Sequence, residues 1–262
     1  MKTARIERVA DGVYAAIAEE GGVAVGNAGF VDISGETLVF DTHVSQAAGR
    51  VLRDEAAKRA PARNVVLSHW HGDHVFGAGV FDAHVVATAG TAELMLERTA
   101  ARLAELKATP LEELAETPFA EIARSELPAL ELRHPDETFE TERVFGRATA
   151  LTYGGGHTLS DAVLWIEDVR VLFAADLVVE GHPWIGDGVP QAWPGILDRL
   201  AELRPEKIVQ GHGPVAGPEA IDFVRAYLEA FNNAKPGDPN PYPELPWPEM
   251  WERNLHAHRV AA

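Results

Sequence analysis

The stretch Ser68 to His74, SHWHGDH, places three histidines and an aspartate in one short segment. It directly follows the apolar run NVVL, which is typical of a buried strand. Residues i and i+2 of an extended segment project to the same side, so His69 and His71 can aim at one point. Asp73 and His74 fall where the chain turns toward a helix and can face a second point. The segment therefore predicts a metal-binding loop at the end of a strand.

The residue types in this loop suit a divalent cation. Neutral imidazole is a good ligand for zinc and other borderline metals, and a carboxylate suits harder ones. Surface or helix-capping histidines are the alternative, but the spacing H-x-H-x-D-H after an apolar strand favours a metal. The chain contains no cysteine, so nitrogen and oxygen atoms must hold any ion.

The loop alone leaves a metal short of ligands, and three later positions can supply them. His157 follows three glycines in GGGHTLSD, where the backbone can approach an ion closely. Asp176 ends an apolar strand in FAADLVV, where a carboxylate is costly to bury unless it is paired or bound to a cation. His212 lies between two glycines in VQGHGP, again just past a strand. Each signal is weak alone, and together they predict one shared site.

With these residues in order, the sequence resembles the metallo-β-lactamase-fold superfamily of hydrolases over most of residues 9 to 232. The resemblance implies an α/β fold, a four-layer αβ/βα sandwich of two mixed sheets flanked by helices, with the site at one edge. An aspartate stands at the position where some zinc β-lactamases have cysteine. The chain therefore looks like the bridging-aspartate branches, such as glyoxalase II and the lactonases, although it carries no obvious signature of any one of them.

The resemblance also implies how the ligands divide between two divalent ions. The ions would be zinc, with manganese or iron as alternatives. The expected ligands are His69, His71 and His157 for the first ion, Asp73, His74 and His212 for the second, and Asp176 as a bridge between the two.

Such a site predicts an enzyme, a dinuclear metal-dependent hydrolase. Two cations that share a water lower its pKa toward neutrality, so that a bridging hydroxide can attack the carbonyl of a small ester, lactone, thioester or amide. Asp73 is the expected catalytic residue, because it can ligate the second ion and also orient the hydroxide. The alternatives are a di-iron oxidoreductase or sulfur dioxygenase on the same scaffold, a metallo-nuclease, and a binding module without catalysis. The substrate does not follow from the sequence.

Three further residues are candidates for support or substrate contact. Asp41 ends the strand next to the one that leads into the histidine loop, and could accept a proton from a ligand imidazole. A plain turn aspartate is an equal alternative there. His182 and Trp184 lie shortly after Asp176 in EGHPWIGDG and could reach the rim of a pocket.

The order of elements along the chain agrees with a layered α/β domain over residues 1 to 234. In the segments LVFDTHV and VLFAADLV, an apolar strand ends in an aspartate, which suggests two related halves. The expected strands are 13–17, 30–33, 37–40, 64–67, 84–87, 147–153, 162–166, 171–175 and 207–210, and the expected helices begin at Ser45, Gly195 and about Pro218.

Two segments stand apart from this pattern. Residues from about 91 to 127 have helical spacing and two helix-start signals, at Thr109-Pro110 and Thr117-Pro118. They predict a helical insertion that is peripheral, or else a lid over a pocket. Residues 235 to 262 are rich in proline and predict an extended strap rather than a helix. Its aromatic residues, Tyr242, Trp247 and Trp251, should pack on the body or on a partner subunit.

The charge of the chain limits its partners. The formal net charge is −17, with 40 acidic and 23 basic residues, and no basic patch stands out. Such a surface repels phosphate backbones and anionic membranes, so we expect a small-molecule substrate and neither nucleic acid nor membrane. The absence of cysteine and of an apolar signal segment predicts a cytoplasmic protein. A homodimer is left open.

Overall fold

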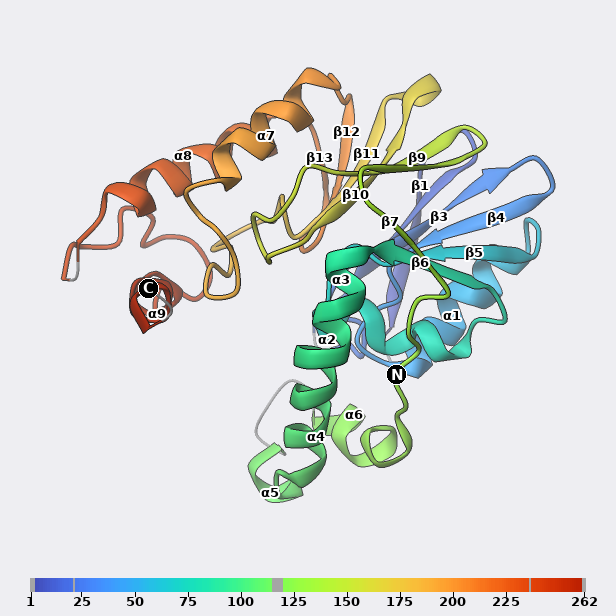
Figure 1. The fold of residues 1–262 in the computed structure, drawn as a ribbon, viewed down its shortest axis with the longest axis horizontal. Coiled ribbons are helices and arrows are strands. Elements are labelled where there is room, and N and C mark those ends of the chain that lie inside the picture. Colours follow the sequence, from blue (N-terminus) through green and yellow to red (C-terminus); the bar gives the residue numbers. More distant parts are fainter. Residues whose placement is uncertain (1–2, 21, 115–119, 236, 261–262) are drawn as a thin grey trace.

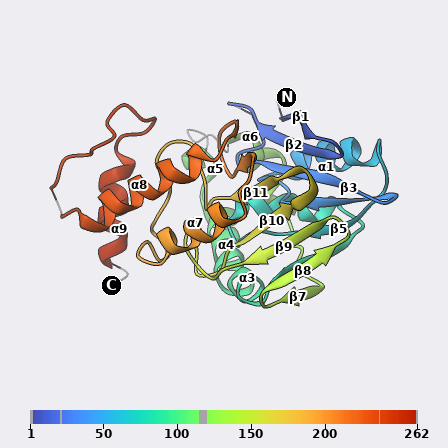
Figure 2. The same ribbon diagram turned by 90° about the horizontal axis from the view of Figure 1, so that it is seen from above.

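The structure is a computed structural model that describes residues 3–20, 22–114, 120–235 and 237–260. Within this part of the chain, the strands form two mixed sheets that lie face to face (Figure 1). Helices cover the outer face of each sheet, as Figure 2 shows from above. The predicted helix start at Thr117-Pro118 lies outside the described residues.

The first sheet contains seven strands in the order of the chain. Its first four strands are antiparallel neighbours, and the last four are parallel neighbours. The strands are β1 (Ala4–Ala10), β2 (Val13–Ala18), β3 (Ala28–Ile33), β4 (Glu36–Phe40), β5 (Ala62–Val66), β6 (His84–Thr88) and β7 (Glu137–Phe139).

The second sheet contains six strands in the order β13-β12-β11-β10-β9-β8. Its one parallel pair among the described residues is β11 with β12. The strands are β8 (Glu142–Phe145), β9 (Ala148–Thr152), β10 (Ala162–Ile166), β11 (Val171–Ala175), β12 (Lys207–Gln210) and β13 (Val215–Ala216).

The helices divide between the two outer faces. The α-helices are α1 (Gln46–Ala57), α2 (Gly72–Val75), α3 (Ala89–Leu94), α4 (Ala100–Ala108), α5 (Leu111–Leu114), α6 (Ala120–Ser125), α7 (Trp193–Glu202), α8 (Glu219–Asn233) and α9 (Met250–Val260). A π-helical turn, η2 (Met95–Thr99), joins α3 to α4. The 3-10 turns are η1 (Phe76–Val80) after α2, η3 (Leu127–Ala129) after α6, and η4 (Glu167–Val169) before β11.

Side-chain alternation along the strands builds three apolar layers. In β4, Leu38 and Phe40 point into the core between the two sheets, whereas Val39 points to the outer core beneath α1. Neighbouring residues of a strand face opposite sides, so a strand that is apolar throughout must be covered on both faces. The third layer packs the outer face of the second sheet against α7, α8 and α9, with Trp193 and Trp251 almost fully buried. The expected αβ/βα sandwich is confirmed.

The parallel strand pairs determine where the functional loops meet. β4 runs parallel to β5 in one sheet, and β11 runs parallel to β12 in the other. The carboxyl ends of parallel neighbours lie at the same edge of a sheet. Asp41 and Asp176 directly follow β4 and β11, so the two aspartates occupy equivalent places in the two halves of the molecule.

The tail differs from the prediction for residues 235 to 262. It ends in a helix, α9, rather than remaining extended, because the last proline is Pro248 and helix formation is free after it. Trp251 is buried against Tyr227 and Phe231 of α8, but Trp247 is 69% exposed and does not pack on the body. None of the described helices has the length and apolarity needed to cross a membrane.

Candidate metal centre

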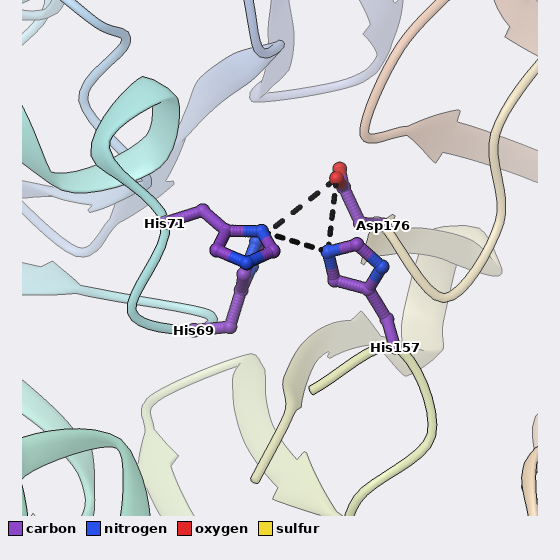
Figure 3. A group of neighbouring side chains, drawn as sticks. All are labelled: His69, His71, His157 and Asp176. Carbon is purple, nitrogen blue, oxygen red and sulfur yellow. Dashed lines mark hydrogen bonds and ion pairs between the residues drawn. The ribbon is translucent and has the colours of Figure 1, made fainter. Parts of the chain in front are cut away.

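The structure brings all seven predicted ligand residues to one edge of the sandwich. They form two adjoining groups, in each of which the candidate ligand atoms lie within 4.8 Å of one another. Figure 3 shows the first group, with three imidazoles and a carboxylate that point toward one another. The groups are His69, His71, His157 and Asp176, and then Asp73, His74 and His212.

Asp176 faces both groups. Its Oδ2 lies 3.3 Å from Nε2 of His157 and 3.3 Å from Nε2 of His212, which belong to different groups. The same oxygen is 4.0 Å from Nε2 of His69, and its Oδ1 is 3.1 Å from Nε2 of His74. The Asp176 carboxylate therefore lies between the two groups, with four imidazole nitrogens around it.

Asp73 completes the second group. Its Oδ2 lies 3.3 Å from Nε2 of His212 and 3.7 Å from Nε2 of His74. The side chain of Asp73 is 22% exposed, whereas that of His74 is fully buried. Asp73 therefore contacts the imidazole nitrogens of this group and also lines a cavity that opens beside them.

Outer hydrogen bonds fix which nitrogen of each imidazole faces the centre. Ser68 Oγ donates to Asp41 Oδ2 (2.7 Å), so it can accept from Nδ1 of His69 (2.8 Å). Nδ1 of His74 donates to the same Asp41 oxygen at 2.9 Å, and Nδ1 of His157 donates to the Trp184 carbonyl at 3.1 Å. Each of these rings therefore turns its Nδ1 outward and its Nε2 toward the centre.

His71 is held in the opposite orientation. Its Nε2 donates to Asp187 Oδ2 at 3.2 Å, so its bare nitrogen is Nδ1. That Nδ1 faces Nε2 of His157 at 2.9 Å. The outer nitrogens of both rings are engaged by Asp187 and by the Trp184 carbonyl, so the two inner nitrogens are the ones that face the centre as candidate ligand atoms.

Buried polar atoms without hydrogen-bond partners provide an independent test of whether these residues suit a metal ion. Nε2 of His69 is buried and makes no hydrogen bond, and the buried Nε2 of His74 and Oδ1 of Asp176 have only each other, at 3.1 Å. Buried polar atoms are rarely left without partners, since each costs about 1–3 kcal/mol. These three atoms all point into the cluster, and the donor set of imidazole nitrogens and carboxylate oxygens fits divalent metal ions.

The electrostatics differ between the two groups. Burial lowers the pKa of His69 well below its ordinary value, and burial also lowers the pKa of His157, so both are neutral and ready to bind a metal. Burial also disfavours charge on His74 and His212, but the carboxylates outweigh it. Asp176, Asp73 and Asp41 raise the pKa of His74 well above its ordinary value, and Asp176 and Asp73 raise that of His212 to about 10.

Asp41 contacts Ser68 and His74 and belongs to neither ligand group. It is 1% exposed, has a left-handed backbone (φ 56°), and accepts hydrogen bonds from the Ser68 amide and hydroxyl as well as from His74. Burial raises the pKa of Asp41, against the opposing effects of His74 and Ser68. The aspartate therefore orients one imidazole of each group, directly for His74 and through Ser68 for His69.

Substitution of Asp41 by asparagine should weaken metal binding without removing a ligand. The amide cannot accept from both Ser68 and His74 through two anionic oxygens, and we expect the affinity for zinc to fall by ~10–100-fold. Competition with a fluorescent zinc chelator measures this loss. Asp54→Asn, on an exposed part of α1, is the matched control. An unchanged affinity in Asp41→Asn would show that Asp41 is only a turn residue.

The structure separates the two candidate substrate contacts. Trp184 lines a cavity beside the centre. His182 does not contribute to the described lining of that cavity: its Nδ1 is 2.9 Å from the hydroxyl of Tyr227, and its ring packs edge-on against that residue. The chain turns after Asp176 and places the half-buried His182 against Tyr227 of α8.

Asp187 is a residue that the sequence did not indicate. Its Oδ2 accepts from Nε2 of His71 and, at 2.7 Å, from Nε1 of Trp184, and Arg98 lies 3.5 Å from its Oδ1. Burial acts against the ionised form, but the bonds from His71 and Trp184 prevail and lower the pKa of Asp187 to about 2. The residue lies in a loop without a strand before it, so no pattern marked it.

Comparison with known proteins agrees with this geometry. The model of the metallo-beta-lactamase superfamily matches residues 21–212. The metallo-beta-lactamase type 2 of Bacteroides fragilis is 24% identical over 232 residues, which are 83% of this chain and 82% of that protein. In fold, the chain resembles the metallo-beta-lactamase FIM-1 of Pseudomonas aeruginosa, solved in a mono-zinc form (TM-score 0.68, 16% identity, 89% of this chain and 98% of the other).

A second solved structure shows the same likeness. The metallo-beta-lactamase of Hirschia baltica has a TM-score of 0.66 and 16% identity, with 87% of this chain and 98% of the other covered. The family match spans both groups of candidate ligands, from before His69 to His212. The chain therefore belongs to the metallo-beta-lactamase superfamily and is an enzyme, a metal-dependent hydrolase.

Proposed function

We propose that this hydrolase holds two divalent ions, zinc in the first instance, and cleaves a small ester, lactone, thioester or amide. The observation that carries the proposal is the position of Asp176, whose carboxylate faces His157 of one group and both His74 and His212 of the other. A single-ion site needs no carboxylate shared in this way. Manganese and iron would accept the same nitrogen and oxygen ligands.

The bound ions and the side chains of the site would have different roles in hydrolysis. When bound, the ions supply Lewis acidity toward the substrate carbonyl and lower the pKa of an attacking water. Asp73 is ionised, because His74 and His212 hold its pKa below the ordinary range against the effect of burial. Its carboxylate can accept a hydrogen bond from the attacking water and hold that water in line with the carbonyl. His71 and Asp73 both line the cavity, so the substrate carbonyl is bound between the two ligand groups.

β-Lactam antibiotics are disfavoured as substrates. Their carboxylate calls for a cationic partner near the site, and lysine is the expected one. Lys107 donates to the Leu130 carbonyl and Lys207 to the Val9 carbonyl, and no lysine is among the described residues that line the cavity. Arg102 does line it, but its guanidinium is paired with Glu105 at 2.6 Å. The acidic balance of the chain and the Asp187 carboxylate on the cavity wall add to this preference for uncharged substrates.

The test of the proposed function is hydrolysis by zinc-replete enzyme and by Asp73→Asn. We expect the wild type to hydrolyse p-nitrophenyl esters and lactones but not single-stranded RNA. The variant should lose ~100-fold in kcat/KM, more than its metal content alone explains, since misplacing a reacting group by about 1 Å can cost ~10²-fold. Asp222→Asn, at an exposed position of α8, is the control. Full activity of Asp73→Asn at normal metal content would contradict the role of Asp73.

Metal binding should release protons at neutral pH. The pKa of His212 is raised to about 10, so this imidazole carries a proton in the metal-free protein at pH 7 and must lose it to become a ligand. Affinity for zinc should therefore rise with pH, about tenfold per unit for each proton displaced, until the pH passes the pKa. Calorimetric titration in buffers with different ionisation enthalpies measures the release. Heats that do not depend on the buffer would contradict it.

A further inference from the structure

A cavity of about 490 Å³ opens beside the metal centre. One of its walls comes from the body of the sandwich and includes Val44, Trp70 and Phe76, which are all buried. The opposite wall comes from the helical insertion between β6 and β7. The residues of that wall are Thr99, Arg102, Leu106, Leu114, Ile122, Leu127 and Leu130.

The insertion is therefore not peripheral to the site, in contrast to the interpretation that its sequence favoured. It is tied to the metal-binding loop by Thr99, whose hydroxyl donates to the carbonyl of Trp70 at 2.6 Å. Thr99 ends the π-helical turn η2, a local irregularity that is frequent at functional sites. A second tie is the contact of Arg98 with Asp187, which in turn accepts from His71.

The chemistry of the cavity changes from one end to the other. His71, Asp73 and Asp187 line the end at the metal centre, where the reacting carbonyl would lie. Leu106, Ile122 and the other apolar residues of the insertion line the remainder. A ligand that fills the cavity must therefore place a polar reacting group at one end and an apolar group at the other.

The polar side chains of the insertion wall are already engaged. The Thr99 hydroxyl is bonded to Trp70, and Arg102, 57% exposed at the mouth of the cavity, donates to Glu105 at 2.6 Å. A polar substituent placed among the leucines would lose its hydrogen bonds to water and gain none from the insertion wall, which costs about 1–3 kcal/mol in proteins. An uncharged alkyl or aryl group meets no such penalty.

We propose that the cavity binds an apolar chain of the substrate, so that the enzyme acts on esters, thioesters or lactones that carry an alkyl or aryl group of several carbons. The inference rests on the proposed function, because it takes the carbonyl to react at the metal end. It adds the substrate class, and it assigns to the insertion the role of the wall that recognises the chain. The chain can be attached on the acyl side or on the alcohol side of the carbonyl.

The first experiment measures hydrolysis by zinc-replete enzyme as the apolar chain lengthens. One arm uses p-nitrophenyl acetate, butyrate, hexanoate and octanoate, and the other uses ethyl, butyl, hexyl and octyl acetate. We expect kcat/KM to rise about fourfold per methylene that enters the cavity, which corresponds to ~0.8 kcal/mol per buried methylene. A rise in one arm identifies the side that carries the chain. Flat profiles in both arms would overturn the proposal.

A pair of variants tests the wall itself. Leu106→Trp on α4 adds bulk to the cavity and should flatten the chain-length profile, with octyl and octanoyl substrates losing at least ~10-fold relative to the shortest ones. Leu96→Trp adds the same group at a side chain that is 65% exposed and outside the described lining, and should leave the profile unchanged. Equal profiles in the two variants would contradict the placement of the chain.

Binding without catalysis separates this proposal from the proposed function. Metal-free protein is titrated with the neutral fluorophore N-phenyl-1-naphthylamine, which we expect to be displaced by methyl octyl ketone and not by acetone. Displacement without hydrolysis of any ester would uphold the cavity and overturn the hydrolase proposal for these substrates. Hydrolysis that ignores chain length, together with no displacement by the long ketone, would uphold the hydrolase and overturn the cavity proposal.

Discussion

Substitution of Asp176 by asparagine is expected to reduce kcat/KM by at least ~10³-fold, a loss of about 4 kcal/mol of transition-state stabilisation. The carboxylate faces imidazoles of both groups, so its replacement removes a negative charge from both candidate ion sites at once. We expect the bound zinc to fall below one ion per chain. Steady-state kinetics and elemental analysis of the same preparation measure the two effects.

The surrounding imidazoles give this substitution a second signature. In the metal-free protein, Asp176 is the leading attraction that raises the pKa of His74 and of His212 against burial. Without it, both pKa values should fall toward the ordinary histidine range, which NMR titration of the imidazole protons detects. Asp198→Asn, with a side chain that is 63% exposed, is the matched control. Normal zinc content and activity in Asp176→Asn would contradict the bridging position.

Substitution of Gly211 by alanine is expected to disrupt the same centre from the backbone side. An added Cβ at Gly211 would lie 1.9 Å from Oδ1 of Asp176 and 2.6 Å from the carbonyl carbon of Ala175. Moving backbone atoms away from the added Cβ costs free energy, because the whole loop and Asp176 must shift together. We expect a loss of at least ~2 kcal/mol in the free energy of unfolding, as overpacking of a dense site gives, together with loss of bound zinc.

Gly195 offers a control for this glycine substitution. It lies within α7, and a Cβ added there meets no atom within 4 Å. Alanine has the higher helix propensity, so Gly195→Ala should raise the free energy of unfolding by up to ~1 kcal/mol and keep both zinc and activity. Chemical denaturation of the two variants compares the effects. Equal stability of Gly211→Ala and the wild type would show that the loop tolerates the added methyl group.

The ligand positions could be predicted from the sequence because each follows a recognisable strand. Strand boundaries at 162–166, 171–175 and 207–210 agree with the structure, and the residues just beyond them supply Asp176 and His212. The Ser45 cap of α1 is likewise confirmed, since its side chain accepts from the Ala48 amide. Local patterns of apolar residues and helix caps are enough to locate the strand ends and the helix start. The fold then brings the strand ends, and the ligand residues on them, to one edge of the sandwich.

Other features depended on contacts that no local pattern records. β1 lies at the edge of its sheet and contains the charged residues Arg5, Glu7 and Arg8. Because these residues interrupt the apolar pattern, the sequence did not predict a strand there. Asp187 gains its role only when its loop folds back onto His71. His182 is close to Asp176 in sequence, yet the turn after β11 directs it to α8. The helical insertion looked peripheral because its apolar residues suit packing on a core as well as they suit lining a cavity.

The central claim is that the ligands of SHWHGDH are split between two ions, and zinc stoichiometry tests it most directly. Zinc-titrated wild type, His71→Ala and His74→Ala are freed of excess metal and analysed by mass spectrometry. The account predicts two ions per chain in the wild type and close to one in each variant, because the two histidines belong to different groups. One ion or none in the wild type, or the loss of every ion in both variants, would contradict it.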